Sequence, residues 1–522
     1  MKTSIPQLCS DEIRDRIRSY YLASEARVVD ELIEAANLSA TERQAISDKA
    51  AGLIIKVRRS STPSMMENFL AEYGLSTREG VALMCLAEAL LRVPDAKTID
   101  DLIEDKISHG GWGKHLGHSG SSLVNASTWA LLLTGKIVAA DDEKGLRMTL
   151  QGLVKRMGEP LIRTAVAQAM KELGRHFVLG TTIEKASSRA RELEAQGYTY
   201  SYDMLGEAAR TEADARRYHL SYSDAITALA PACSHADIRH NPGISVKLSA
   251  LHARYEISQH DRVMSELVAR IASLAILARS ANMGFNIDAE EADRLDISLD
   301  VIEAVLSNPA LKGWDGFGVV VQAFGRRATH VLDWLYALAQ RLDRKIMVRL
   351  VKGAYWDTEI KRAQVLGLDD YPVFTRKVST DVCYITCAKK LLAMTERIYP
   401  QFATHNAHSV AAVLQLARGE DNFEFQRLHG MGESLHDSVL RDQKCRCRIY
   451  APVGKHQDLL AYLVRRLLEN GANSSFVNQI VDTSITPQDI ARDPFEQVTG
   501  LGKDIANPNI AQPGNIYGEH RR

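Results

Sequence analysis

The sequence is poor in cysteine, carries no excess charge of either sign and contains no long apolar run. Seven cysteines in 522 residues do not make a disulfide framework, because the number is small and odd. With 64 basic and 65 acidic residues the net charge is −1, which argues against the basic surface that nucleic-acid binding needs. No apolar stretch approaches the ~20 residues that span a bilayer, and the N-terminus lacks an apolar signal core. We therefore expect a cytoplasmic protein with no nucleic-acid partner.

Common metal and nucleotide motifs are also missing. The absence of HExxH, Walker A and strand-flanked GxGxxG motifs removes support for simple metalloprotease, P-loop and Rossmann interpretations. Cys383 with Cys387 and Cys445 with Cys447 are closely spaced, but a structural zinc site needs four well-spaced ligands. We interpret these pairs as reduced, partly buried cysteines and predict no metal site.

What the N-terminal part does have is a helical pattern. Apolar residues recur at three- and four-residue steps or their sums, and Ser39 with Glu42 has the spacing of a capping box. The apolar stripe consists of Ile13, Ile17, Tyr21, Val28 and Leu32. We interpret residues 109–122, HGGWGKHLGHSGSS, as a loop between helices, and we predict helices up to about Tyr218 without a strand. The first helices could pack on each other or on a second subunit, so a homo-oligomer is open.

After about residue 240 the pattern changes to short β-branched runs that alternate with helical segments. The spacing of roughly 20 to 40 residues between most runs is that of parallel strands with crossover helices. Eight such units predict an α/β fold of the (β/α)8 barrel type, preceded by helices, and a doubly wound open sheet is the alternative. The predicted strands are Ile244–Leu248, Gly284–Asp288, Gly318–Gln322, Ile346–Val351, Phe402–His405, Glu424–His429, Arg446–Tyr450 and a weak Ser474–Val477.

Most of these apolar strands carry a polar side chain at or near the C-terminal end. A buried charge is costly without a partner, whereas the C-terminal mouth of a barrel is where barrel enzymes place their chemistry. Seven such residues in comparable positions therefore predict a ligand site. They are Lys247, Asp288, Gln322, Arg349, His405, Gln426 and Tyr450.

Two further segments fit a site for an anionic ligand. In the helical segment 459–471, Tyr462, Arg465, Arg466 and Glu469 share one face, and an arginine pair suits a carboxylate. Taken alone, the pattern is also that of a solvated surface helix. In the segment IMVRLVKGAYWD, two small residues precede two aromatic ones, which fits a flat anionic ligand such as a flavin dinucleotide, or equally an aromatic plug at the barrel rim.

With these residues laid out, the chain resembles the proline dehydrogenase portion of the bifunctional bacterial proline utilization A flavoproteins. The resemblance covers nearly the whole chain. It rests on VKLSALHARY, NIDAEEADRLDISLD, VVVQAFGRR, MVRLVKGAYWDTEIKRAQ, PVFTRKVSTDVCY, FATHNAHSV, FEFQRLHGMGE, CRIYAPVG and LVRRLLENGANSSFV. We accordingly expect a helical arm (1–57), a helical domain (58–178), the barrel (179–495) and a C-terminal linker segment (496–522).

The resemblance implies oxidation of L-proline to Δ1-pyrroline-5-carboxylate, with FAD accepting the hydride at N5 and membrane quinone reoxidising it, and hence peripheral association with the inner face of the membrane. It implies that Arg465, Arg466 and Lys247 bind the proline carboxylate. The rest of the substrate pocket would consist of Asp288, Tyr355, Tyr450, Tyr462 and Glu469. The FAD would be held by Gln322, Arg349, Lys352, Gly353, Ala354, Trp356, Thr375, Lys377, His405, Asn406, Gln426, Glu469, Ser475 and Phe476.

Long members of this family can begin with a ribbon-helix-helix DNA-binding domain and end with an aldehyde dehydrogenase domain. The sequence shows neither, so we expect a fragment of a bifunctional enzyme without repression or the second oxidation. Two alternatives remain: a Schiff base on Lys247 or Lys352, as in aldolases, and a helical scaffold without activity.

Overall fold

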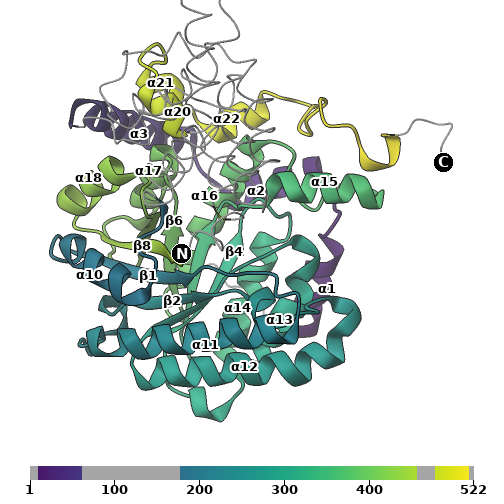
Figure 1. Ribbon diagram of the computed structural model, residues 1–522. Coiled ribbons are helices and arrows are strands. Elements are labelled where there is room, and N and C mark those ends of the chain that lie inside the picture. The colour runs from purple at the N-terminus through teal and green to yellow at the C-terminus, as the bar shows by residue number, and fades with distance from the viewer. Residues whose placement is uncertain (1–9, 61–176, 455–461, 463–475, 517–522) are drawn as a thin grey trace, which may run out of the picture.

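The predicted (β/α)8 barrel is present, and its eight parallel strands close in sequential order (Figure 1). The computed structural model describes residues 10–60, 177–454, 462 and 476–516. Closure of the sheet is incompatible with the doubly wound alternative. The strands are β1 (Tyr198–Met204), β2 (Gly243–Val246), β3 (Gly284–Ile287), β4 (Phe317–Gln322), β5 (Ile346–Val351), β6 (Ile398–Ala403), β7 (Glu424–Leu428) and β8 (Arg446–Val453).

The first strand corrects the prediction that no strand precedes residue 240. In the segment YTYSYDM, Tyr198, Tyr200 and Tyr202 occupy alternate positions and all three are buried. Aromatic residues at every second position favour a strand, and β1 pairs with both β2 and β8 to close the barrel. The prediction of a weak strand at Ser474–Val477 was wrong, because helix α20 begins at Phe476. Residues 474 and 475 lie outside the described residues.

Helices cover the outside of the barrel, and their apolar faces form the core with the strands. On α12, for example, Val263, Leu267 and Ile271 follow a four-residue spacing and are fully buried. Thr211 and Asp214 form a capping box that starts α11. The barrel helices are α10 (Ile183–Glu194), α11 (Glu212–Leu229), α12 (His260–Ser280), α13 (Leu295–Leu306), α14 (Ala328–Arg341), α15 (Trp356–Leu366), α16 (Lys377–Ala393), α17 (Ala407–Ala417) and α18 (Glu433–Gln443).

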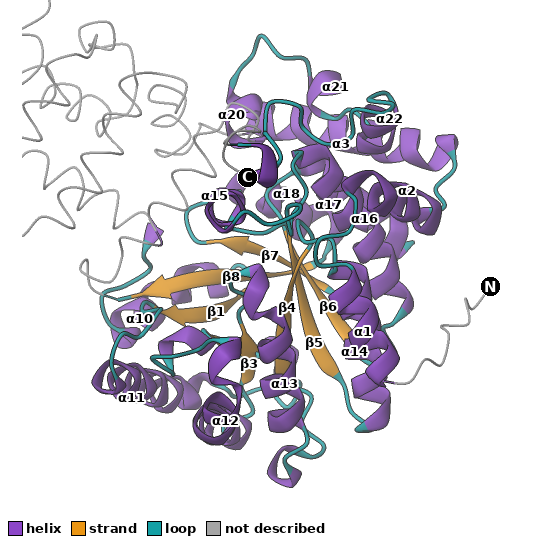
Figure 2. Ribbon diagram, turned by 90° about the vertical axis from the view of Figure 1, so that its right-hand side faces the viewer, coloured by secondary structure: helices purple, strands orange, loops and turns teal. Residues whose placement is uncertain are grey.

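The N-terminal helices pack on the barrel of the same chain, an arrangement that the sequence did not indicate. These are α1 (Ser10–Ser19), α2 (Glu25–Ala36) and α3 (Ala40–Ser60), which lie against α14, α16 and α17 respectively (Figure 2). The expected capping box is present, since the Ser39 amide donates to Glu42 and the Glu42 amide donates to Ser39. Of the predicted apolar stripe, all residues are buried except Tyr21, which is half-buried beside the buried Tyr20.

The C-terminal part of the described chain adds three short helices above the same side of the barrel as α3. They are α20 (Phe476–Val481), α21 (Pro487–Ile490) and α22 (Pro494–Thr499). Among the described helices, none combines the length and apolar character needed to cross a membrane.

Candidate active site

Four of the predicted site residues meet inside the C-terminal mouth of the barrel. Lys247 directly follows β2 and Asp288 directly follows β3, whereas Arg349 lies in β5 and Tyr450 in β8. All four side chains are at least largely buried. Because parallel strands end at one mouth, residues separated by more than 200 positions come into direct contact there.

Asp288 is the centre of this group. Its Oδ2 accepts a hydrogen bond from the Tyr450 hydroxyl (2.7 Å) and a longer one from Lys247 Nζ (3.3 Å). Its Oδ1 accepts from Arg349 Nη1 (3.0 Å). The Arg349 guanidinium also lies 5.2 Å from the centre of the Tyr450 ring. Asp288 thereby fixes the positions of two cations and one phenol.

Asp203 completes the group, and sequence reasoning missed it. It is the sixth residue of β1, it is 1% exposed, and its Oδ1 lies 2.8 Å from Lys247 Nζ. The alternating tyrosines of YTYSYDM were the available signal, because recognition of that strand would have placed an aspartate near its C-terminal end. We call Asp203, Lys247, Asp288, Arg349 and Tyr450 the mouth cluster.

The mouth cluster balances two carboxylates against two cations. Burial alone would lower the pKa of Lys247, but Asp203, Tyr450 and Asp288 outweigh it and hold this pKa well above its usual value. Burial, reinforced by Asp203 and Asp288, raises the pKa of Tyr450, so the phenol stays protonated and donates. Burial also raises the pKa of Asp203, an effect that Lys247 opposes. The cluster thus presents fixed charges in a place with little water.

Arg349 of the mouth cluster and Gln426 of β7 each have a buried polar atom without a hydrogen-bond partner among the described residues. They are Nε of Arg349 and Oε1 of Gln426. The other nitrogens of Arg349 donate to Ser201 and Ser245 as well as to Asp288, and Gln426 Nε2 donates to Glu424 (2.8 Å). An unsatisfied buried donor and acceptor cost free energy, which a bound polar group would recover.

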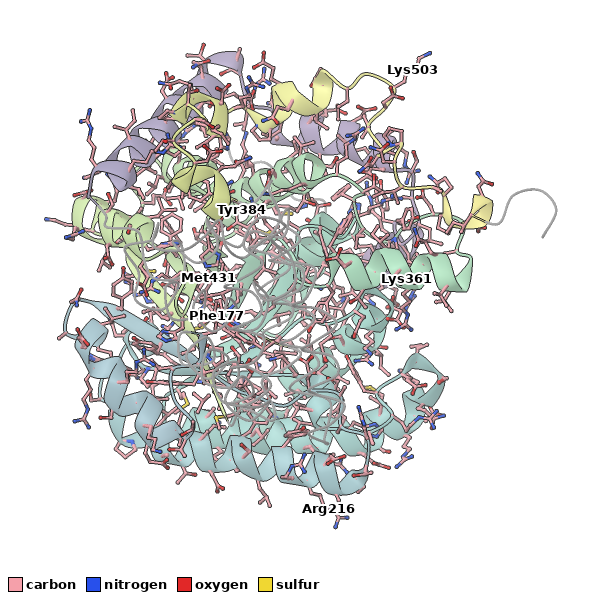
Figure 3. All side chains as sticks on the ribbon, turned by 45° about the horizontal axis from the view of Figure 1, so that its top comes forward. Phe177, Arg216, Lys361, Tyr384, Met431 and Lys503 are labelled. Carbon is pink, nitrogen blue, oxygen red and sulfur yellow. The ribbon has the colours of Figure 1, made fainter. Side chains whose placement is uncertain are left out.

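In the segment after β5, the Phe324 ring fills the space beside Gly353. Gly353 has φ +130°, and a Cβ there would lie 2.5 Å from the Phe324 ring, so only glycine fits. Lys352 pairs with Asp381 and lies 5.8 Å from the centre of the Tyr384 ring, which Figure 3 labels.

Two aromatic residues follow this glycine segment. Tyr355 packs against the small apolar cluster that contains Phe324, and Ala354 lies between Tyr355 and Gly353 in the chain. Trp356 begins α15 and donates from Nε1 to the Phe374 carbonyl (2.8 Å).

Thr375 lies against the N-terminal helices. Its amide and its hydroxyl both donate to Glu25 of α2, the hydroxyl at 2.7 Å, and the same hydroxyl accepts from the Asn507 amide at 2.8 Å. Arg326, which is fully buried, pairs with Glu25 and with Asp370. A role of Thr375 in cofactor binding stays a prediction.

The remaining predicted residues occupy separate positions. Gln322 donates to the Glu290 carbonyl (2.8 Å), His405 Nε2 accepts from the Leu428 amide (3.0 Å), and Asn406 caps α17. Lys377 begins α16, and Tyr462 and Phe476 are buried. Arg465, Arg466, Glu469 and Ser475 lie outside the described residues. The predicted loop 109–122 and the rest of the predicted helix 459–471 also lie outside them.

A cavity of about 60 Å³ lies beside the mouth cluster, between the ends of β3 and β4 and the helix α13. Apolar side chains form most of its wall, and Glu290, Arg294 and Tyr255 give it a polar part. Burial raises the pKa of Glu290 to about 7, although its carboxylate accepts a hydrogen bond from the Ser249 amide.

The five cysteines in the described part of the chain are all free. Cys383 and Cys387 are free and buried with their sulfurs 3.9 Å apart, and Cys447 is free and buried as well. Within the described ranges, no three His, Cys, Asp or Glu side chains are grouped so that they could hold a metal ion.

Comparison with known proteins identifies the family. The sequence model described as Proline dehydrogenase matches residues 186–479, which contain every residue of the mouth cluster. The model described as Proline utilization A proline dehydrogenase N-terminal domain matches residues 11–58. The model described as DNA-binding domain of Proline dehydrogenase matches residues 65–177, of which the structure describes only the last, so the absence of a nucleic-acid partner stays a prediction. The chain belongs to the proline dehydrogenase family.

Its similarity to individual proteins extends over almost the whole chain. The Bifunctional protein PutA of Escherichia coli (strain K12) is 51% identical over 535 residues, which cover 99% of this chain and 40% of that protein. Proline dehydrogenase 1 of Bacillus subtilis (strain 168) is 28% identical and covers 61% of this chain and 93% of its own length. A crystal structure of bifunctional proline utilization A (PutA) superposes with a TM-score of 0.75 at 49% identity, over 96% of this chain and 50% of that one. The chain thus spans about 40% of the length of the PutA relative.

Proposed function

We propose that the chain is a proline dehydrogenase that oxidises L-proline to Δ1-pyrroline-5-carboxylate. The observation that carries this proposal is the mouth cluster, which places two cations, two carboxylates and a phenol inside a barrel of the proline dehydrogenase family. L-Proline is small, carries a carboxylate and an amine, and requires a site that orients both. Charges held in a buried site that contains little water provide such orientation.

FAD is the cofactor that the proposal requires, and the described residues fit it. The unpartnered Nε of Arg349 and Oε1 of Gln426 offer one donor and one acceptor to the polar edge of a flavin ring. The Gly353 segment brings the aromatic Tyr355 and Trp356 to the same mouth. When bound, FAD supplies an acceptor, N5, for the hydride that leaves the carbon next to the proline nitrogen.

The chain's own residues would then bind and orient the substrate. Lys247, together with Arg465 and Arg466, would bind the carboxylate, and Asp288 and Tyr450 would line the ring side of the pocket with Tyr355, Tyr462 and Glu469. Because Asp288 fixes Arg349, Lys247 and Tyr450 before substrate binds, little reorganisation is needed. We assign no covalent nucleophile to the reaction.

Several finer points belong to the same proposal. Membrane quinone would take the electrons from the reduced cofactor, which implies a cytoplasmic enzyme with peripheral contact to the inner face of the membrane and leaves a homo-oligomer open. Residues 1–57, 58–178, 179–495 and 496–522 would form the arm, helical domain, barrel and linker.

The alternative of lysine Schiff-base chemistry has less support in the geometry. A Schiff-base lysine must present a neutral amine, which in enzymes is achieved by a lowered pKa. The pKa of Lys247 is held well above its usual value by its buried acidic partners, and Lys352 is paired with Asp381.

The visible spectrum of the purified protein tests the proposed function. We expect a flavin band that bleaches when L-proline is added without air. An Asp288→Asn variant should keep the band and bleach at least about a hundredfold more slowly, since it loses the charge that holds both cations. A protein without a flavin band after purification in excess FAD, or a band that proline leaves unchanged, would contradict the proposal.

A further inference from the structure

Asp203 has no role in the proposed function so far, yet it makes the shortest bond in the mouth cluster to Lys247. Its Oδ1 lies 2.8 Å from Lys247 Nζ, compared with 3.3 Å for Asp288 Oδ2. Asp203 is 1% exposed and belongs to β1, a strand fixed on both sides by β2 and β8. Its carboxylate is therefore rigidly placed against the lysine.

The carboxylates of Asp203 and Asp288 interact with Lys247 to different extents. Asp288 divides its oxygens among the lysine, the Arg349 guanidinium and the Tyr450 hydroxyl. Asp203 accepts a hydrogen bond of 2.8 Å from Lys247 and has the Tyr450 hydroxyl as a second partner. A substrate carboxylate that reaches the lysine must meet an ammonium that is charged and correctly aimed, because a neutral amine provides no charge complement.

We infer that Asp203 is a positioning residue for the substrate carboxylate, acting through Lys247, which it keeps charged and aimed into the mouth. This inference rests on the proposed function, because it assigns Lys247 to the proline carboxylate. Asp203 itself touches neither the substrate nor the reacting carbon. Its effect is on how tightly proline binds, and hence on KM rather than kcat.

The pH dependence of binding follows from the groups that face Lys247. Without Asp203, burial would lower the pKa of Lys247 against weaker opposition, so the lysine would become neutral at a lower pH than in the wild type. Above that pH, proline would lose one cationic partner. The charged and titratable groups around the lysine are Asp203 on β1, Asp288 after β3, Arg349 on β5, Tyr450 on β8 and Tyr222 on α11.

The first experiment compares KM and kcat for L-proline between pH 6.5 and 9.5 in the FAD-loaded wild type, Asp203→Asn and Asp203→Glu. The ratio of variant to wild-type KM cancels the ionisation of proline itself. We expect this ratio to rise about tenfold or more over the range for Asp203→Asn, with a smaller change in kcat and partial rescue by Asp203→Glu. A ratio that stays constant with pH overturns the inference.

A matched control is available at the opposite end of the barrel. Glu424 is as deeply buried as Asp203 and pairs with Arg448 at 2.7 Å. Glu424→Gln removes an equivalent buried charge without touching Lys247. The new amide oxygen can still accept from Gln426, and the assay contains excess FAD. This variant should have a lower thermal stability, and its ratio of variant to wild-type KM should not change with pH. If the ratio rises with pH in this variant too, the effect of Asp203→Asn is explained by general destabilisation, and the inference is overturned.

A double-mutant cycle separates action through Lys247 from any other effect. In a Lys247→Met background, Asp203→Asn should change KM by less than about twofold, because the coupling partner is gone. The double variant also removes both buried charges, so it can be made even if Asp203→Asn alone does not fold. A further tenfold change in that background would overturn the inference.

A binding measurement without turnover completes the test. Tetrahydrofuran-2-carboxylate keeps the ring and carboxylate of proline but has oxygen in place of the nitrogen, so it probes the carboxylate contacts alone. Its Kd, measured by titration calorimetry, should show the same pH-dependent weakening in Asp203→Asn. Wild-type protein that fails to bleach with proline would refute the proposed function, whereas bleaching with an unchanged variant profile refutes only the role of Asp203.

Discussion

The barrel contains two buried networks of charge, one at its mouth and one at its floor, and they are built differently. At the mouth, Lys247 pairs with Asp203 at 2.8 Å; at the floor, Arg448 pairs with Glu424 at 2.7 Å. Both pairs join one strand to a neighbour inside the same barrel. The difference lies in what the remaining donors bind.

The floor network is closed by backbone groups. Arg448 donates to the carbonyl oxygens of Tyr200, Asn241 and Arg239 in addition to Glu424. The Tyr200 carbonyl belongs to β1, and the Arg239 and Asn241 carbonyls belong to the short segment before β2, so they can move only if the backbone there rearranges. The floor ion pair therefore stabilises the barrel, and no nitrogen of Arg448 is left without a partner.

The mouth network is closed by side chains. Arg349 donates to Asp288 and to two serine hydroxyls, and its Nε has no partner among the described residues. A buried donor without a partner can donate to a bound ligand without the loss of another bond. Buried ion pairs of the same kind thus form a structural element at the floor of the barrel and a candidate site at its mouth.

The largest effect is expected from breaking the floor. Arg448→Met leaves Glu424 buried without its cation, and loss of one member of a buried pair costs about 3–5 kcal/mol of unfolding free energy. Urea unfolding followed by circular dichroism measures this loss. The double variant Arg448→Met/Glu424→Gln should regain part of it. If the single variant unfolds like the wild type, the floor is not a stabilising element.

Glu290, beside the mouth, should make stability depend on pH. Burial raises its pKa from 4.5 to about 7 in the folded protein, so the folded state binds the proton more tightly than the unfolded state between these values. The unfolding free energy should therefore fall as pH rises from about 4.5 to about 7, by up to about 3 kcal/mol. Glu290→Gln should flatten this part of the profile in urea titrations at pH 5 and pH 8. An equal pH dependence in both proteins would contradict the assignment.

The sequence predicted the barrel, seven of its strands and four members of the mouth cluster, because each depends on a local pattern. Lys247, Asp288, Arg349 and Tyr450 stand out as polar residues at or near the ends of apolar strands. Asp203 was missed because the strand that carries it is rich in polar residues and lies before the obvious barrel pattern.

Contacts between segments far apart in the sequence could not be predicted from it, for a different reason. The Glu25 carboxylate bonds to Thr375 across 350 positions, and neither residue shows an unusual local pattern. Only the packing of α2 on α16 brings the two together. The same holds for Arg448, whose floor role depends on carbonyl oxygens that no side-chain pattern reveals.

Gly353 offers a test of the mouth through the backbone. Gly353→Ala would force an L-residue to φ +130° and bring its Cβ to 2.5 Å from the Phe324 ring, for an expected cost of about 1–3 kcal/mol. FAD affinity, measured by fluorescence titration, should fall together with stability. Gly367→Ala is the control: its φ is +61° and no heavy atom lies within 4 Å of the new Cβ, so about 1 kcal/mol of stability and no cofactor affinity should be lost. Equal effects would show that Phe324 does not confine the segment.

The test with the smallest expected effect removes one tyrosine hydroxyl at each end of the barrel. Tyr450→Phe removes the donor to Asp288 (2.7 Å) and keeps the ring over Arg349, whereas Tyr399→Phe removes a hydroxyl that contacts Glu424 at 3.4 Å on the floor. A hydrogen bond to a charged group contributes about 1.5 kcal/mol, so Tyr450→Phe should lower kcat/KM for proline about tenfold. Tyr399→Phe should change only the unfolding free energy, by less than about 1 kcal/mol, because its longer bond serves a network without a ligand. If both variants lose the same activity, the two networks are coupled through the barrel interior, and the division into a site and a structural floor fails.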